Sequence, residues 1–434
     1  MRRLTSLIRI PLLFPLLSVL YAGARFMVIS GQPATRFPDS IGFETLNFLG
    51  KNDRLWSVPF FYALIDLEQN RLIMQAILGS CAWTFLAWVL SSISRFPRAT
   101  MTTVFVIGLA PQVVRFDVAI LSESLGITFA VAAVGATLLI TQSRQFIVRV
   151  SWIFLVVLTA FTRTIHLTVL FLIAAYAIGK WLISRRKKTA LPALLFAFLS
   201  VWGVAQLRGN EPTSTLNFYT VLQQRVIRDD AMYAWFTKQG MPDLPGMRSA
   251  VGYNYTWELD PNVASIVQLP PGQQPPALMK AGGVSLAEWV RDNGWPTYAR
   301  YVQSHPSYVT SLLRRMTPES LSPPTDAFLP LAARSVMWRG IFGPTWLWLL
   351  LLAVSLSASV LISRNKKALR AVISLTAAST VVFIGVHLTS AIEPQRHSVT
   401  TAVLLRVLVL ASIAVLTARP TRSTTRDESD AELL

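Results

Sequence analysis

The chain has 434 residues and is poor in cysteine, histidine and charged side chains. Its one cysteine, Cys81, excludes a disulfide framework and a zinc site built from cysteine. Four scattered histidines leave little material for a histidine metal cluster. Charged residues make up 14% of the sequence, whereas a typical soluble domain has about 25%. This composition argues against a chain of two or three soluble domains.

Three common catalytic motifs are also absent from the sequence. There is no G-x-x-x-x-G-K-[ST] phosphate loop, no H-E-x-x-H zinc motif and no G-x-S-x-G nucleophile turn. The sequence shows no internal repeat either, although membrane transporters commonly contain related halves. Any chemistry must therefore come from side chains that the fold brings together.

The sequence does have many long apolar stretches. Hydrophobic residues make up 53% of the chain, and the mean hydropathy is +0.47. A membrane-spanning helix needs about 20 mostly apolar residues. We therefore predict an all-α polytopic membrane protein with a bundle of about ten transmembrane helices, within a range of about nine to eleven. The predicted spans are 7–29, 70–93, 100–114, 118–141, 149–162, 165–183, 190–207, 341–363, 368–391 and 399–417.

Two of these stretches need comment. The first could be a cleaved signal peptide, because Arg2-Arg3 precede it and Ala22-Gly23-Ala24 resembles a cleavage site. Arg9 interrupts the apolar run, which favours a retained span. The third stretch carries Pro111, and we expect it to end at the break formed by residues 115–117.

Basic residues outnumber acidic ones by 40 to 22, which gives a net charge of +18. Such a charge indicates either nucleic-acid binding or a membrane protein that keeps its positive charges on one side. With the N-terminus inside, the predicted inner segments hold 18 Lys and Arg, and the short outer loops hold seven. The charge therefore acts as an orientation signal and needs no nucleic acid. Both termini are predicted to be cytoplasmic.

The spans divide the chain into four predicted parts. Residues 1–207 form an N-terminal membrane module of about seven spans, with a first outer loop at 30–69. Residues 208–339 form a mostly helical outer insertion of 132 residues with 12 basic and 10 acidic groups. Residues 340–417 form a C-terminal membrane module of about three spans. Residues 418–434 are predicted to be a disordered cytoplasmic tail.

Within the insertion, composition predicts three local features. The Pro- and Gly-rich stretch 269–283 is expected to be a loop between helical pieces. Residues 285–292 begin with a plausible helix cap, and 298–316 are amphipathic. Tryptophan side chains in such a domain belong to the hydrophobic core more often than they stack on sugar rings. Both roles are open for Trp235, Trp257, Trp289 and Trp295.

Acidic residues near the predicted outer boundary are candidates for chemistry. Asp39 follows Pro38, which is ordinary turn chemistry, and its alternative role is a general base for an acceptor hydroxyl. Glu123 lies just inside the fourth predicted span, where an ionised side chain normally faces protein or water. A structural partner such as Arg115 is the alternative to a functional role. Asp117 and Glu123 are six residues apart, so on a helix they need not share a face.

Basic residues at the same boundary are candidates for anion binding. Arg163 and Arg396 have planar guanidinium groups that suit an oxyanion such as a lipid phosphate. Ordinary contact with lipid headgroups is the alternative for each of them. Arg406 lies seven residues inside the last predicted span, and there we expect a buried ion pair.

Five short segments occur in a characteristic order. Asp39-Ser40-Ile41-Gly42-Phe43 is followed by Ser57-Val58-Pro59-Phe60-Phe61-Tyr62 and by Ser122-Glu123-Ser124-Leu125. Arg163 then lies at the junction of the fifth and sixth spans, and Arg396-His397 precedes the last span. This order resembles the GT-C superfamily of integral-membrane glycosyltransferases, which use polyprenyl-phosphate-linked sugars.

The resemblance implies a GT-C-like bundle in the inner (plasma) membrane of a bacterium, with an extracytoplasmic active site. It implies that Asp39 is the catalytic base. It also implies donor-phosphate contacts for Arg163, Arg396 and the adjacent His397. Supporting or acceptor-side candidates are Glu123, Asp117, Arg115 and Glu44.

The implied reaction moves a sugar from the polyprenyl-phosphate carrier to a hydroxyl of a glycan, lipid or protein acceptor. A single displacement of this kind inverts the anomeric centre. We expect no cofactor and no obligatory divalent metal, because a monophosphate carrier needs less neutralisation than a nucleotide diphosphate. The alternatives are a transporter or flippase for lipid-linked saccharides, and an O-antigen-type polymerase or ligase.

Overall fold

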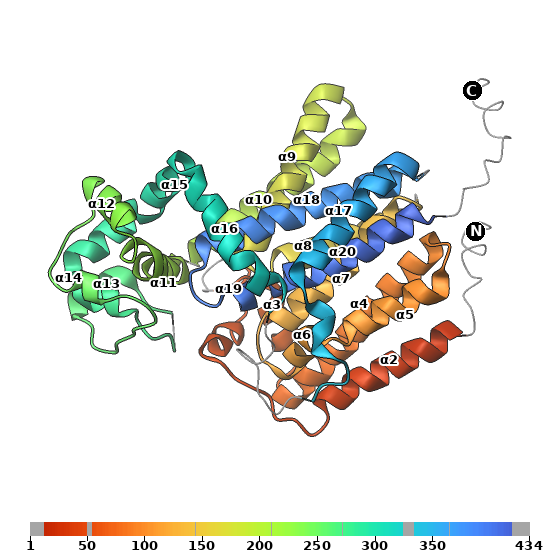
Figure 1. Cartoon of the computed structure of the whole chain (residues 1–434), viewed down its shortest axis with the longest axis horizontal. Coiled ribbons are helices and arrows are strands. Elements are labelled where there is room, and N and C mark those ends of the chain that lie inside the picture. Colours follow the sequence, from red (N-terminus) through yellow and green to blue (C-terminus); the bar gives the residue numbers. More distant parts are fainter. Residues whose placement is uncertain are drawn as a thin grey trace.

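The computed structural model describes residues 13–49, 54–143, 145–209, 211–270, 272–323, 334–363 and 365–418. Helices form nearly all of the regular structure, and no strand occurs in these ranges (Figure 1). The only extended pairings among them are three isolated bridges. The predicted tail and the start of the first predicted span lie outside the described residues.

Seven helical segments are long and apolar enough to cross a membrane. A bent pair of helices can supply an eighth crossing: α5 (Pro97–Gly108) continues at 55° into Pro111–Val118, which includes α6 (Pro111–Val114). Two shorter apolar helices are α2 (Leu13–Ile29) and α8 (Phe146–Ala160). The seven segments are α4 (Glu68–Ile93), α7 (Glu123–Ile140), Thr164–Ser184 with α9 (Leu167–Ser184), Thr189–Arg208 within α10 (Lys187–Gly209), α17 (Thr345–Ile362), α18 (Lys366–Thr389) and α20 (Val399–Leu416).

The prediction of an all-α, multi-pass membrane protein is therefore confirmed at this coarse level. Each of the ten predicted spans corresponds to one of these helices or to the bent pair, whereas the exact number of crossings stays a prediction. The predicted end of the third span at residues 115–117 agrees with α6, which ends at Val114, but the break after Gly108 that divides the span into α5 and α6 was not predicted. Ala110 has extended backbone angles before Pro111, and a proline disfavours helical geometry in the preceding residue.

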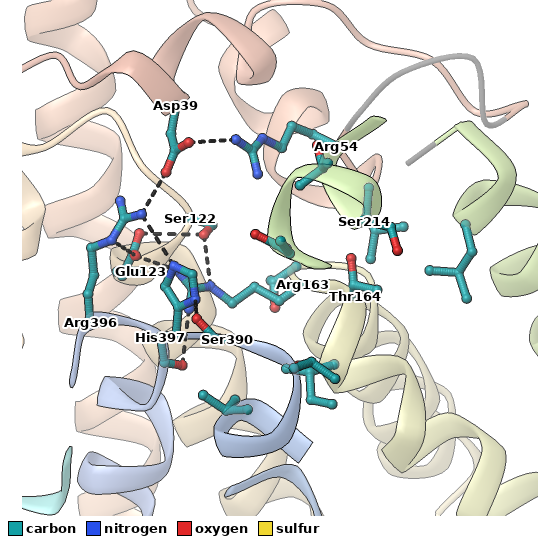
Figure 2. Close-up of a pocket in the computed structure, with 18 of the residues that line it drawn as sticks. Asp39, Arg54, Ser122, Glu123, Arg163, Thr164, Ser214, Ser390, Arg396 and His397 are labelled. Atoms are coloured by element: carbon teal, nitrogen blue, oxygen red, sulfur yellow. Dashed lines mark hydrogen bonds and ion pairs between the residues drawn. The ribbon is translucent and has the colours of Figure 1, made fainter. Parts of the chain in front are cut away.

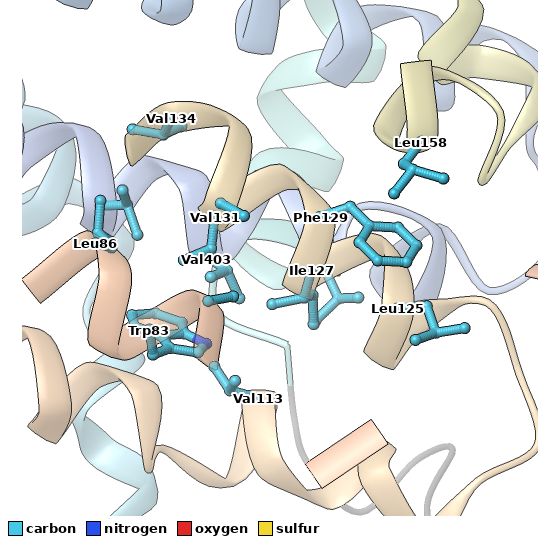
Figure 3. Packing of buried hydrophobic residues seen from close by; sticks show 14 of the residues in the cluster. Trp83, Leu86, Val113, Leu125, Ile127, Phe129, Val131, Val134, Leu158 and Val403 are labelled. Carbon is cyan, nitrogen blue, oxygen red and sulfur yellow. The ribbon is translucent and has the colours of Figure 1, made fainter. Parts of the chain in front are cut away.

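Helices α7 and α20 form the centre of the bundle. In each of them, 83% of the 18-residue apolar stretch that could span a membrane is buried, compared with 11% in α17. Alanine and glycine are frequent in α7, and small residues let neighbouring helices approach closely. The two central helices pack with α4 around Trp83, Leu86, Val131, Val134 and Val403 (Figure 3). The remaining helices keep many apolar side chains exposed, as lipid-facing helices do.

Residues 211–270 and 272–323 form most of the described part of the insertion, which lies at one end of the bundle (Figure 1). We call this end the insertion end. The insertion has a hydrophobic cluster of its own that includes Phe218, Tyr233, Phe236 and Leu286. Its helices are α11 (Glu211–Val221), a π-helix (Leu222–Val226), α12 (Asp230–Lys238), α13 (Pro261–Val267), α14 (Ala277–Trp289), a second π-helix (Val290–Gly294), α15 (Trp295–Ser304) and α16 (Pro306–Leu321).

Two local predictions for the insertion need correction. The stretch predicted as a loop at 269–283 already contains the first turns of α14, and the helix is interrupted only at Gly283, whose φ is +53°. The amphipathic stretch 298–316 is two helices, because the chain leaves helical geometry at His305 and α16 restarts with Pro306 at its first position.

The opposite end of the bundle joins the end of α4 to the end of α20. Ser94 pairs with Ala418 in an antiparallel bridge, and the Arg95 amide donates to the Thr417 carbonyl over 3.2 Å. At the insertion end, Thr35 pairs with Ala119 in a parallel bridge. The pairing of Thr35 with Ala119 places the first long loop next to the residues that precede α7.

Candidate functional site

A cavity of about 440 Å³ lies at the insertion end, between the loops of the bundle and the insertion. Figure 2 shows its charged side chains converging from the first loop, the start of α7, the start of Thr164–Ser184 and the segment before α20. Its walls are formed by Asp39, Phe43, Arg54, Leu55, Leu121, Ser122, Glu123, Thr162, Arg163, Thr164, Ile165, Thr168, Phe171, Leu207, Thr213, Ser214, Asn217, Trp295, Val386, Thr389, Ser390, Arg396 and His397.

Asp39 lies in the short 3-10 helix Pro38–Phe43, which begins at a proline. The next residue fixes this helix in place, because the Ser40 hydroxyl donates to the Ile120 carbonyl over 2.7 Å. Tyr62, at the end of the second motif-like segment, donates in the same way to the Leu121 carbonyl over 2.7 Å. Both bonds hold the first loop against the residues just before Glu123.

Three donors surround the Asp39 carboxylate. Arg396 donates to Oδ2 over 2.6 Å, and Arg54 donates to Oδ1 over 2.8 Å (Figure 2). Gln273 of the insertion also donates to Oδ1, over 2.7 Å. Burial by itself would raise the pKa of Asp39, but the charges of Arg54 and Arg396 outweigh it and hold that pKa well below its usual range. Asp39 is therefore ionised and fully paired in this state.

Glu123 is the first residue of α7 and is almost completely buried. Its carboxylate pairs with the guanidinium of Arg163 and lies 3.6 Å from Nε of Arg396. Arg163 also donates to the Ser122 hydroxyl over 3.0 Å and to the His397 carbonyl over 3.1 Å. Arg163 thus joins the start of α7 to the segment that precedes α20.

Arg396 and His397 lie in the short helix α19 (Pro394–His397). Besides Asp39, Arg396 pairs with Glu393 through an Nε–Oε2 distance of 2.7 Å. Nδ1 of His397 lies 2.8 Å from the Ser390 hydroxyl. Burial, together with the charges of Arg163 and Arg396, lowers the pKa of His397 well below its ordinary value, so this imidazole is neutral at physiological pH.

We call Asp39, Arg54, Glu123, Arg163, Glu393, Arg396 and His397 the charged cluster. Five of its members were among the residues predicted from the sequence as site residues: Asp39, Glu123, Arg163, Arg396 and His397. Glu393 was noted only as part of the segment before the last span. The structure brings these side chains together, while their roles stay predictions.

Three other predicted site residues do not line the cavity. Asp117 is buried and accepts two hydrogen bonds from Arg25, over 2.6 and 2.9 Å, and one from Ser124 over 2.6 Å. Glu44 pairs with Arg36 at an exposed position of the first loop. Arg115 is not the partner of Glu123, since it donates to the Ser335 hydroxyl over 2.8 Å.

The predicted ion pair of Arg406 is also absent from the described part of the chain. Arg406 is fully buried in α20 and donates to the carbonyls of Ala402 and Phe342. Its guanidinium lies 4.4 Å from the ring centre of Phe342 and 5.3 Å from that of Trp348. Backbone carbonyls and aromatic faces thus supply the negative potential that an acid was expected to supply.

Several lining residues were not predicted from the sequence. Arg54 was counted among the outer basic residues, but nothing in the sequence separated it from the others. Asn217, which lines the cavity, and Gln273, which bonds to Asp39, both come from the insertion, far from Asp39 along the chain. Trp295 was named as a possible sugar-stacking residue and does line the cavity, whereas Trp235 and Trp289 pack in or against the cluster of the insertion.

The cavity has an apolar side opposite its charges. Ile165 and Phe171 come from the segment Thr164–Ser184, Leu207 comes from α10 and Val386 comes from α18. Away from the cavity, these helices are largely exposed. In the 18-residue apolar stretch of each helix, only 22% is buried in Thr164–Ser184 and only 28% in α18. The site therefore offers guanidinium groups for an anion beside apolar helices that face the lipid.

Among the described residues, no three His, Cys, Asp or Glu side chains are grouped in a way that could hold a metal ion. The carboxylates of the charged cluster are instead neutralised by arginines. No protein-family model, curated protein or solved structure matches the chain. Fold and site together define a multi-pass helical membrane protein with an amphipathic cavity between its bundle and a helical insertion.

Proposed function

We propose that the protein is a membrane glycosyltransferase of the GT-C type, which moves a sugar from a polyprenyl-phosphate carrier to an acceptor hydroxyl at the insertion end. In this proposal, the insertion end faces the extracytoplasmic side of a bacterial plasma membrane. The observation that carries the proposal is the cavity itself, where a buried carboxylate and three guanidinium groups lie beside an apolar helical wall.

The donor is an amphipathic molecule with an apolar tail and an anionic phosphate. Its tail must stay in the bilayer, so its phosphate can reach only groups near the membrane boundary. Arg54, Arg163 and Arg396 lie there, and the planar fork of arginine binds phosphate oxygens in pairs. When the donor enters, its phosphate binds guanidinium groups that are otherwise paired with Asp39 and Glu393.

This exchange of partners also prepares Asp39 for catalysis. A carboxylate that is paired with two arginines is a weak base, because its pKa lies far below the operating pH. Once Arg54 and Arg396 turn to the phosphate, burial dominates and the pKa of Asp39 rises. Donor binding would therefore switch on the base only when there is a sugar to transfer.

The reaction then proceeds as one displacement. Asp39 accepts the proton of the acceptor hydroxyl while the hydroxyl oxygen forms a bond with the anomeric carbon. The bond between that carbon and the phosphate oxygen breaks, and polyprenyl phosphate leaves with the bonding electrons. Arg163 and Arg396 stabilise the negative charge that the leaving group gains. The anomeric centre is inverted.

The packing of the motif-like segments supports the family assignment. The segment with Asp39 and the segment that ends at Tyr62 both hydrogen-bond to residues 120 and 121, which directly precede Ser122 and Glu123. Arg163 then bonds to Ser122 and to the backbone of His397. Five segments that are far apart in the sequence thus share one site.

The test is a transfer assay on purified, reconstituted protein with a radiolabelled polyprenyl-phosphate sugar. Asp39→Asn should lower the transfer rate by about 10²- to 10⁴-fold, the range usual for a general base, while the protein still inserts and folds. Glu44→Gln is the matched control, because it neutralises a paired carboxylate of the same loop outside the cavity. It should leave the rate unchanged.

Two results would contradict this proposal. Near-normal transfer by Asp39→Asn would exclude Asp39 as the base. Movement of the labelled lipid across the bilayer without a new glycosidic bond would identify a transporter instead.

A further inference from the structure

One stretch of the insertion exposes aromatic rings, which sets it apart from the aromatic residues packed in the core. Tyr253 is 63% exposed, Tyr255 is 36% exposed and Trp257 is 70% exposed. The three aromatic residues lie within five consecutive positions of the chain. Exposed apolar groups gathered in this way commonly mark a binding surface.

Backbone hydrogen bonds hold the middle of this stretch against residues 275–277. Tyr255 pairs with Pro276 in an antiparallel bridge, and the Asn254 carbonyl accepts a hydrogen bond of 2.9 Å from the Ala277 amide. The Thr256 amide donates to the Pro275 carbonyl, also over 2.9 Å. The rings are therefore presented on an ordered segment.

A buried glutamine fixes the same segment from behind. Gln223, in the π-helix Leu222–Val226, donates to the carbonyls of Gly252 and Asn254 over 2.9 and 2.7 Å, and accepts from the Leu278 amide over 2.8 Å. Such supporting hydrogen bonds hold binding groups in place before a ligand arrives.

The segment lies next to the charged cluster. Tyr255 pairs with Pro276, and Gln273, three residues before Pro276, donates to Asp39 of the charged cluster over 2.7 Å. Burial raises the pKa of the Tyr255 hydroxyl, and the charge of Glu393 raises it further. Glu393 pairs with Arg396, and Arg396 pairs with Asp39. Ala391, two residues before Glu393, packs in the hydrophobic cluster of the insertion. The aromatic rings and the cavity are thus connected through one loop.

We propose that Tyr253, Tyr255 and Trp257 form a platform for the pyranose rings of a saccharide that extends out of the cavity. The C–H groups on one face of a pyranose carry partial positive charge and fit the negative face of an aromatic ring. Polar residues whose side chains can bond sugar hydroxyls alternate with the aromatic residues along the chain, at Asn254, Thr256 and Glu258.

The chemistry of the segment favours a saccharide over an anionic lipid surface. Residues 251–260 carry Glu258 and Asp260 but no lysine or arginine, whereas segments that bind anionic membranes are rich in basic residues. Lys280, which lies beside Glu258, is already paired with it. The identification of this saccharide as the acceptor rests on the proposed transferase function, but its binding to the platform does not.

The binding test uses fluorescently labelled full-length protein in nanodiscs on an array of immobilised oligosaccharides. Tyr253→Ala combined with Trp257→Ala should weaken binding to the recognised saccharide by about tenfold or more, equivalent to about 1.4 kcal/mol. Tyr253→Phe combined with Trp257→Phe keeps the rings and should keep the binding. Trp338→Ala removes an equally exposed ring outside the platform and serves as the control.

Further arms separate this inference from the transferase proposal. Asp39→Asn should bind the array like the wild type, because binding precedes chemistry. In the transfer assay, loss of the two rings should raise the KM for the acceptor by about tenfold and leave kcat nearly unchanged.

The inference fails if every oligosaccharide on the array binds the wild type and the double variant Tyr253→Ala with Trp257→Ala equally well. It also fails if brominated lipids quench wild-type fluorescence more than that of Trp257→Phe, since Trp257 would then contact the bilayer. Unchanged acceptor KM in an active enzyme would exclude the platform as an acceptor site. Saccharide binding without any transfer would leave the platform standing and remove the transferase proposal.

Discussion

Asp39 and Glu393 contact the same guanidinium, that of Arg396, yet their pKa values shift in opposite directions. Arg54 provides Asp39 with a second cation, and the two arginines together outweigh burial. For Glu393, burial is the largest effect, and the charges of Asp39 and Glu123 add to it, so its pKa is raised. Of these two carboxylates, Glu393 is therefore the one that more readily gains a proton.

This difference predicts how donor binding depends on pH. An anionic phosphodiester is repelled by ionised Glu393, so its affinity should rise as the pH falls through the raised pKa of Glu393. Glu393→Gln should bind the donor about tenfold more tightly at neutral pH and lose this pH dependence. Binding of a phosphodiester donor, measured between pH 5 and 8, tests this. An unchanged pH dependence in the variant would exclude Glu393 as its source.

His397 predicts a pH effect on stability. Its pKa is depressed in the folded protein, so only the unfolded chain gains a proton there near pH 6.5. Its contribution to stability is complete above that pH and is lost on acidification, by up to ~1.4 kcal/mol per pH unit. The unfolding temperature of the wild type should therefore fall between pH 7.5 and pH 5. The unfolding temperature of His397→Gln should fall less over the same range. Equal slopes would contradict this.

At the scale of helices, a buried ion pair fixes α2 to the bend between α5 and α7. Arg25 of α2 donates twice to Asp117, and the Tyr21 hydroxyl accepts from Arg25 over 3.0 Å. The guanidinium packs directly over Gly79 of α4, where a Cβ atom would overlap it. Only glycine leaves room at this position for the ion pair.

Gly79→Ala should therefore displace Arg25 and leave Asp117 buried without its partner. Breaking a buried pair costs about 3–5 kcal/mol, which exceeds the ~1 kcal/mol that alanine gains over glycine in a helix. Gly23→Ala in α2 is the matched control, because nothing lies within 4 Å of its added Cβ. Thermal unfolding in detergent measures both variants. Equal stability of the two would show that Arg25 can move without cost.

The sequence predicted the long apolar helices of the bundle, because the length of an apolar run is enough to indicate a span. It did not predict the partner of Asp117, since Arg25 lies 92 residues away in another helix. The site was predicted in part for a related reason. Asp39, Arg163 and Arg396 stand in recognisable local motifs, whereas Gln273 reaches Asp39 only through the packing of the insertion. Contacts of that kind leave no local signal.

For the whole molecule, the important contact is the one between insertion and bundle. Arg225, in the π-helix Leu222–Val226, donates to the carbonyls of Leu388 and Ser390 at the end of α18. The Ser390 hydroxyl in turn lies 2.8 Å from Nδ1 of His397. The insertion thus holds the loop that carries part of the charged cluster.

Arg225→Gln should loosen this loop while the insertion keeps its own hydrophobic cluster. We expect kcat to fall by about tenfold or more, because small displacements of positioned groups are costly in catalysis. Lys238→Gln, at an exposed position of the insertion, should have no effect. Transfer kinetics together with circular dichroism test the pair of variants. A normal kcat in Arg225→Gln would show that the loop keeps its position without this contact.

The charged cluster is close to electrically neutral, because three guanidinium groups (Arg54, Arg163 and Arg396) face three carboxylates (Asp39, Glu123 and Glu393). Such a site projects little field beyond a Debye length of about 8 Å at physiological ionic strength. A water-soluble anion approaching from outside would gain no long-range attraction. A substrate anchored in the bilayer needs none, because it diffuses in two dimensions and meets the arginines at short range. Its capture should therefore depend on its surface density in the membrane and hardly at all on the salt concentration of the surrounding medium.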